Sequence, residues 1–125
     1  NPWPWSVEMG FQQAVEVSGE RRTLHCSGQT SVDADGTPIN AGDMVAQVNQ
    51  ALDNLEAVLA GAGMTLADVV KLNMYTTDVD AFMGALMEVG ERLATSGLEQ
   101  CGTLLGVARL AYPELMVELE ATAEA

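Results

Sequence analysis

The sequence is poor in basic residues. Five lysine and arginine residues stand against 18 acidic residues among 125, which gives a formal net charge of -13 at pH 7. The electric field of such a chain repels phosphate backbones and anionic lipid headgroups. The adjacent basic pair Arg21-Arg22 is not accompanied by a stripe of aromatic and basic residues. The charge balance therefore argues against nucleic acid and membranes as partners.

Cysteine, histidine and long apolar runs are also scarce. Two cysteines are too few for a disulfide scaffold, and we expect Cys101 to be an inert buried thiol. The single histidine, His25, excludes a metal site built from several histidines, and we expect it to pack in an interface. No apolar run approaches the roughly 20 residues of a membrane span, and residues 1–5 lack the features of a secretion signal. These absences predict a cytoplasmic protein.

Apolar residues, at 48% of the chain, are numerous enough to fill one core, so we expect one domain over residues 1–125. Period-two alternation predicts five strands, at residues 11–17, 23–28, 69–76, 103–108 and 115–122. Apolar residues at three- and four-residue steps predict two helices, one at residues 43–63 and one along the stripe Phe82, Leu86, Val89 and Leu93. The order is ββαβαββ, an α+β domain whose first two strands form a hairpin.

Strand alternation also predicts two different sheet faces. One face is apolar, and the two helices can cover it. The other face is mixed and has no helix left to cover it: Gln12, Ala14, Glu16, His25, Ser27, Asn73, Tyr75, Leu104, Gly106, Ala108, Met116, Glu118 and Glu120. An uncovered mixed face marks an association surface, so the pattern predicts a homo-oligomer. Polar groups buried at that interface must be paired or take part in chemistry.

Two polar residues of this uncovered face are candidates for chemistry. Ser27 and Glu118 share it by parity, and a carboxylate enclosed in a partly apolar interface can act as an acid or base near neutral pH. The alternative role for Glu118 is structural, with its carboxylate binding backbone amides across the interface. For Arg109, which follows the fourth strand, we expect an ion pair, and contact with an anion is the alternative.

Six short segments in order resemble the RidA/YjgF family of reactive-intermediate deaminases, also called L-PSP endoribonuclease-like proteins. They are Phe-Gln-Gln-Ala at 11–14, Ser-Gly-Gln at 27–29, Asn-Leu-Glu-Ala-Val at 54–58, Asp-Val-Val-Lys at 68–71, Gly-Val-Ala-Arg-Leu at 106–110 and Val-Glu-Leu-Glu-Ala at 117–121. The resemblance implies a chorismate-mutase-like fold and a homotrimer with clefts between subunits. It also implies hydrolysis of enamines and imines to 2-keto acids and ammonia, without a metal or organic cofactor.

The resemblance further implies which residues form the cleft. Glu118 matches the glutamate that positions or activates water. The substrate-binding positions are Phe11, Ser27, Gly28, Gln29, Leu86, Gly102, Thr103 and Leu104. Three of them lack the family's polar groups, because Gly102 replaces an arginine that clamps a carboxylate, Phe11 a tyrosine and Leu86 an asparagine. The chain thus resembles an arginine-lacking branch, whose larger and less positive pocket suits a ligand other than a simple 2-imino acid.

Three functions follow from these residues. The first is a small-molecule hydrolase or deaminase, with Glu118 handling water. The second is a trimeric binding or regulatory protein that holds a metabolite without turnover. The third, ribonuclease activity, is disfavoured by the net charge of -13.

Overall fold

The main helix begins where a side chain can cap it. In the computed structural model, which describes residues 1–125, Asp43 accepts a hydrogen bond from the amide of Ala46 and starts helix α2 (Met44–Gly61). Asp78 caps α3 (Val79–Glu88) in the same way through the amide of Ala81. These bonds satisfy amides that the first helical turn leaves unpaired. The predicted second helix continues after Val89 as a separate short helix, α4 (Gly90–Thr95), because Gly90 has low helix propensity.

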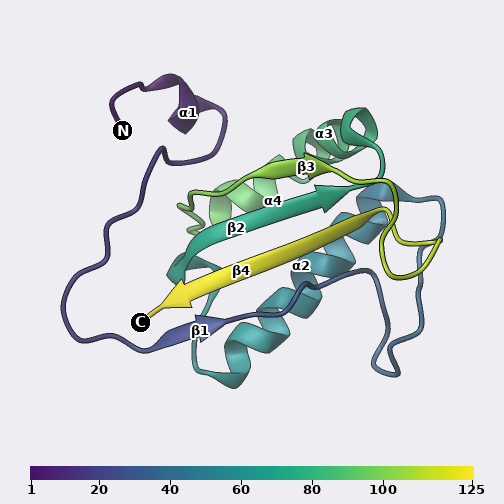
Figure 1. The fold of residues 1–125 in the computed structure, drawn as a ribbon, viewed down its shortest axis with the longest axis horizontal. Coiled ribbons are helices and arrows are strands. Elements are labelled where there is room, and N and C mark those ends of the chain that lie inside the picture. Colours follow the sequence, from purple (N-terminus) through teal and green to yellow (C-terminus); the bar gives the residue numbers. More distant parts are fainter.

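Four strands form one mixed sheet in the order β1-β4-β2-β3 (Figure 1). The edge strand β1 (Thr23–His25) pairs antiparallel with β4 (Val117–Glu124). On its other side β4 pairs antiparallel with β2 (Val69–Thr76), which follows the 3-10 turn η1 (Leu66–Asp68). The second edge strand, β3 (Leu104–Gly106), is parallel to β2. The mixed sheet with helices confirms the predicted α+β class.

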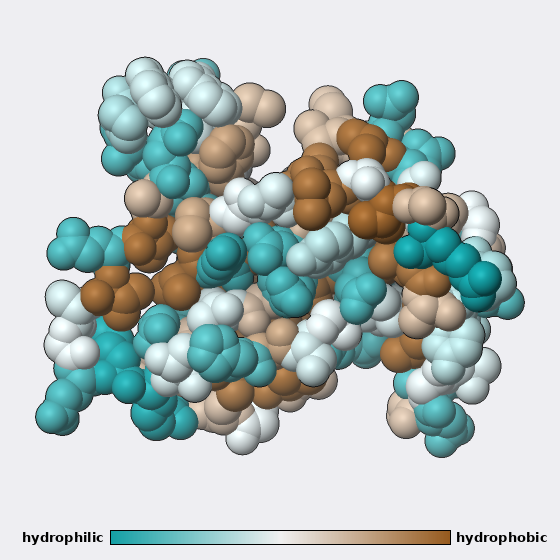
Figure 2. Space-filling model, viewed as in Figure 1, coloured by the Kyte–Doolittle hydropathy of each residue, from teal (hydrophilic) through white to brown (hydrophobic).

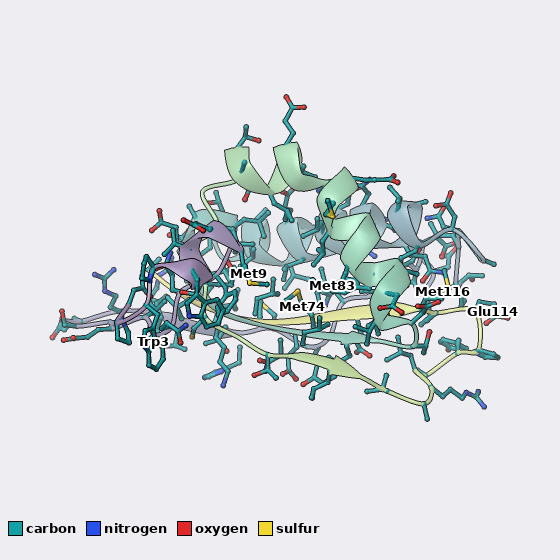
Figure 3. The ribbon with its side chains drawn as sticks, turned by 90° about the horizontal axis from the view of Figure 1, so that it is seen from above. Trp3, Met9, Met74, Met83, Glu114 and Met116 are labelled. Atoms are coloured by element: carbon teal, nitrogen blue, oxygen red, sulfur yellow. The ribbon has the colours of Figure 1, made fainter.

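The helices cover one face of the sheet, and the other face is bare (Figure 3). α2 packs across β4 and against α3, and their apolar side chains form the core between the two layers. Its largest fully buried members are Phe82, Leu52, Leu55, Leu59, Val48, Val69 and Val117. Met74 also lies between the sheet and the helices. The predicted division into one covered and one uncovered face is therefore correct.

The predicted strand at residues 11–17 is wrong. These residues form an irregular arm that runs away from the sheet, and no hairpin partner lies beside β1 (Figure 1). The arm follows a four-residue helix that the sequence did not predict, α1 (Trp5–Glu8). The Phe11 ring packs edge-on against Trp5, with 5.6 Å between ring centroids, and the Gln12 amide donates to the Gln100 carbonyl at 2.8 Å. These contacts hold the start of the arm beside β3, at the edge of the sheet opposite β1.

The predicted face of the fourth strand is also wrong. Leu104 pairs in register with Met74 and packs against the core, while Leu105 pairs with Tyr75 and is 48% exposed. Alternation could not choose between two adjacent leucines, and pairing with β2 decides the face. Met116 likewise packs against the core, because β4 begins only at Val117 and its alternation does not extend back to residue 116.

Candidate functional site

The bare face of the sheet carries a row of polar side chains. Figure 2 views this face and shows hydrophilic side chains over the middle of the sheet, with apolar ones near β3 and α3. In-register pairing across β2 and β4 places Asn73 opposite Glu120 and Tyr75 opposite Glu118. Side chains paired in this way point to the same side of a sheet. Two glutamates, an asparagine and a tyrosine therefore form one cluster on the uncovered face.

Glu118 is half-buried and lies against the backbone of Gly28. A Cβ atom built at Gly28 would come within 1.9 Å of the Glu118 Oε1 atom, so no other residue fits there without displacing the carboxylate. The loop is tied to β4, since the Gln29 amide donates to the Leu119 carbonyl at 2.7 Å and the Leu119 amide donates back at 2.9 Å. The structure thus brings the Ser27-Gly28-Gln29 segment and Glu118 together, as the sequence predicted.

Tyr75, Asn73 and Glu120 belong to the same cluster, although sequence reasoning placed them on this face without assigning them to a site. The Asn73 Nδ2 and the Tyr75 hydroxyl donate to Glu120 Oε1, at 3.1 and 3.3 Å. Desolvation raises the pKa of Tyr75, and the negative charges of Glu120 and Glu118 raise it further. Tyr75 is therefore a neutral phenol at physiological pH and can donate a hydrogen bond. The available sequence signal was strand alternation, which placed Tyr75 on the same predicted face as Glu118.

The remaining predicted cleft residues lie near the opposite edge of the sheet. Gly102 and Thr103 are exposed just before β3, and the Thr103 carbonyl accepts a hydrogen bond from the Met74 amide at 2.8 Å. The bond from Gln12 to Gln100 brings the Phe11 segment beside them. Strands β4 and β2 separate this group from Gly28, a distance of roughly 14 Å for three strand spacings. One chain therefore holds two separate groups of candidate residues.

Two of the predicted binding residues do not face either group. Leu86, on α3, is half-buried and packs against the core, and Leu104 lies on the helix-covered side of the sheet. The apolar character of both side chains suits this environment. Their assignment to a cleft between subunits stays a prediction.

Gly102 allows close backbone approach and leaves no room for a side chain directed toward β2. A Cβ atom built there would lie 1.8 Å from the Leu72 carbonyl oxygen and 2.7 Å from its carbon. Any side chain at this position, that of arginine included, would require the backbone to move. The expectation that Gly102 vacates a larger pocket is therefore not supported by this backbone.

Other residues singled out by the sequence have varied surroundings. His25 is exposed and lines a depression of about 240 Å³ with Lys71, Asn73, Glu120 and Thr122. Burial raises the pKa of the Cys26 thiol. Cys101 is half-buried, and its thiol donates to the Val70 carbonyl at 3.3 Å. Arg109 is exposed and forms no ion pair, contrary to the expectation, because no carboxylate lies within reach of its guanidinium.

The chain contains no group of three or more histidine, cysteine, aspartate or glutamate side chains placed to hold a metal ion. None of its helices is both long and apolar enough to cross a membrane.

Comparison with known proteins shows which family the chain belongs to. The family described as Endoribonuclease L-PSP matches residues 5–125, and the chain belongs to this family. Its resemblance to RidA/YjgF proteins is thereby confirmed. A Rid family protein of unknown function from Yersinia pestis, YyfB, superposes with a TM-score of 0.81 at 40% identity, covering 94% of this chain and 89% of that one. The fold is the chorismate-mutase-like fold of this family.

Curated relatives align over a shorter region. Protein DfrA of Myxococcus xanthus is 36% identical over 72 residues, which are 58% of this chain and 54% of that protein. The mouse 2-iminobutanoate/2-iminopropanoate deaminase is 34% identical over 79 residues, which are 63% of this chain and 56% of the mouse protein. The chain thus spans about half the length of the curated relatives it matches.

The Gly102 contact predicts a position-specific loss of stability. We expect Gly102→Ala to destabilise the protein by about 1–3 kcal/mol, as overpacking does elsewhere. Gly84→Ala is the control, because a Cβ there meets nothing within 4 Å and the exposed helix should gain about 0.5–1 kcal/mol. Urea unfolding of both variants measures the difference. Equal stability of Gly102→Ala and the native protein would show that Leu72 can move aside.

Tyr75 offers a pH-dependent check of the cluster. Because its folded-state pKa is raised, its contribution to stability is complete below the ordinary tyrosine value of about 10 and is lost as the pH rises through the folded-state value. Glu120→Gln should lower the pKa of Tyr75, since it removes a neighbouring negative charge. Tyrosinate absorbance, compared with that of Tyr75→Phe to isolate this residue, follows the change. If Tyr75 titrates in Glu120→Gln as it does in the native protein, Glu120 does not interact with the Tyr75 hydroxyl.

Proposed function

We propose that the protein is a small-molecule hydrolase of the deaminase type that acts on an imine, an enamine or a related compound. The observation that carries this proposal is the half-buried Glu118 carboxylate fixed against the Gly28 backbone on an otherwise bare face. A carboxylate that is held in place and partly shielded from water suits general acid–base chemistry. The family membership and the name of the mouse relative support the same reaction class.

In the proposed reaction, water attacks the carbon of the C=N bond while Glu118 accepts a proton from that water. The proton is then passed to the nitrogen, which leaves a hydroxyl group and an amino group on the same carbon. The hydroxyl group gives up its proton, which also reaches the nitrogen, as the C=O bond forms and the C–N bond breaks, so the products are a carbonyl compound and ammonia. The neutral hydroxyl of Tyr75 lies in register with Glu118 and can donate a hydrogen bond to a polar atom of the substrate. No metal or organic cofactor takes part in these steps.

We propose that the complete site forms between copies of this one-domain chain, in a homotrimer. Two arguments support this assembly. Within one chain, strand β2 separates Glu118 on β4 from Gly102 before β3, and Gly28 lies one strand position further away, beyond β4. The bare face also exposes Leu105 at 48% and carries an Asn73 Oδ1 atom that is buried without a hydrogen-bond partner. A second copy can cover both.

Charge distribution further limits the substrate. Arg92 is committed to Asp53 and Glu56 on the helical layer, with nitrogen–oxygen distances of 2.6 and 3.5 Å. Lys71 is four residues from Tyr75 along β2, or roughly 13 Å. Glu118 forms no ion pair within its own chain, so we expect simple 2-imino acids, which carry a carboxylate, to be poor substrates. Arg109, exposed and unpaired, is the residue that could reverse this expectation from a neighbouring copy.

The same scarcity of positive charge favours, as a second candidate, a trimeric protein that binds a metabolite without turnover. Phe11 carries no hydroxyl, and Gly102 has no side chain to orient a substrate. Ribonuclease activity is the weakest candidate, despite the family's description, because Glu118 and Glu120 face outward on a chain of charge -13. A cytoplasmic location remains a prediction.

Assembly can be checked first. We expect a particle of three times the 13.2 kDa chain mass by light scattering coupled to size exclusion. A monomer at micromolar concentration would contradict both the trimer and the site between copies.

Glu118→Gln tests the chemistry. The substitution preserves shape but removes the proton acceptor, so hydrolysis of a panel of imines and enamines should fall by about 10²- to 10⁴-fold. Ammonia release measures the rate, and light scattering confirms the assembly. Glu124→Gln, on the same strand, is the matched control and should keep native turnover. Native turnover in Glu118→Gln would leave Glu118 a structural role, and no turnover of any compound by the native protein would favour the binding function.

A further inference from the structure

α2 presents a row of amide side chains to the segments that carry the candidate site. Gln47, Gln50 and Asn54 are spaced three and four residues apart and therefore share one face of the helix. Gln47 is fully buried and holds the start of β4: its Oε1 accepts from the Met116 amide and its Nε2 donates to the Glu114 carbonyl, both at 2.8 Å. Met116 is two residues before Glu118 in the chain.

Asn54 makes the equivalent contact with the loop on the other side of the site. Its Nδ2 donates to the carbonyl oxygens of Thr30, at 2.8 Å, and Val32, at 3.0 Å. Its Oδ1 accepts from Gln50 Nε2 at 3.0 Å, so the carboxamide has one orientation that satisfies all three bonds. Thr30 is two residues beyond Gly28. Side chains of α2 thus hydrogen-bond to the start of β4, close to Glu118, and to the loop that follows Gly28.

We infer that Asn54 is a positioning residue, which holds the Ser27-Gly28-Gln29 segment so that the Gly28 backbone sets the place of the Glu118 carboxylate. The contact is tight, since Glu118 Oε1 occupies space within 1.9 Å of where a Gly28 Cβ would lie. A small shift of the loop must therefore move the carboxylate or open a gap beside it. Displacements near 1 Å at reacting groups lower rates by about 10²-fold. The role in turnover rests on the proposed function, whereas the positioning itself does not.

The variant that tests this inference is Asn54→Asp. Aspartate is almost the same size, but it replaces the donating Nδ2 with an oxygen that repels the carbonyls of Thr30 and Val32. Asn49→Asp is the matched control, on the same helix but a different face, where Arg92 Nη1 donates to the Asn49 Oδ1 at 3.0 Å and accommodates a carboxylate. We expect kcat for imine hydrolysis to fall by about ten- to a hundredfold in Asn54→Asp with KM little changed. Asn49→Asp should behave as the native protein.

Two measurements decide the inference without depending on turnover. The Gln29 amide, bonded to the Leu119 carbonyl at 2.7 Å, should exchange with deuterium faster in Asn54→Asp while the core amide of Leu72 stays protected. The carbon-13 chemical shift of the Glu118 carboxyl, which reports on its surroundings, should also differ from that of the native protein. A native chemical shift and native Gln29 exchange in folded Asn54→Asp would overturn the inference. If the native protein hydrolyses no imine, the proposed function fails while these two measurements still report on positioning.

Gly28→Ala serves if Asn54→Asp does not fold. It acts on the same contact from the loop and leaves α2 untouched. Its added Cβ should displace the Glu118 carboxylate and change the carbon-13 chemical shift of the Glu118 carboxyl. An unchanged chemical shift in Gly28→Ala would show that the loop does not set the position of the carboxylate, and the inference would be wrong.

Discussion

The site and the fold around it depend on one buried amide. Gln47 has no exposed surface, and its side chain bonds the Asn40 carbonyl at 3.2 Å as well as the Glu114 carbonyl and the Met116 amide. An unpaired polar group in such a place costs on the order of 1–3 kcal/mol, so all three partners must stay where they are. The helix, the loop before it and the start of β4 consequently hold one relative arrangement. The position of Glu118 on β4, and with it the contact between Glu118 and Gly28, depends on this arrangement.

Glycine has two different purposes near this arrangement. At position 28 the absence of a Cβ makes room for a carboxylate, and at position 102 it lets two backbone segments approach closely. Neither purpose concerns φ, because neither glycine has a positive φ. Gly28 makes room for the Glu118 carboxylate, whereas Gly102 lets the segment before β3 lie close to β2. At position 102 the space that a side chain would need is already taken by the Leu72 backbone.

The electrostatic character of the bare face sets this chain apart from a protein built to bind anions. Glu118 and Glu120 point from the same side of β4, and the charges of both raise the pKa of Tyr75. The basic residue nearest in sequence to this part of the face is Lys71, further along β2. If the proposed function holds, we expect the negative charges of Glu118 and Glu120 to favour neutral or cationic ligands over phosphates and carboxylates.

The sequence by itself determined α2 and α3, the presence of one covered sheet face and the family, because the spacing of apolar residues acts locally. It also placed Ser27 and Glu118 on one face, since parity within a strand is a local property. Only the tertiary structure decided which of Leu104 and Leu105 faces the core, and that residues 11–17 form an arm in place of a strand. Those outcomes depend on pairing between distant segments, which local alternation does not encode. For the same reason, the contact between Gly28 and Glu118, 90 residues apart in sequence, exists only once β4 and the loop have been brought together by α2.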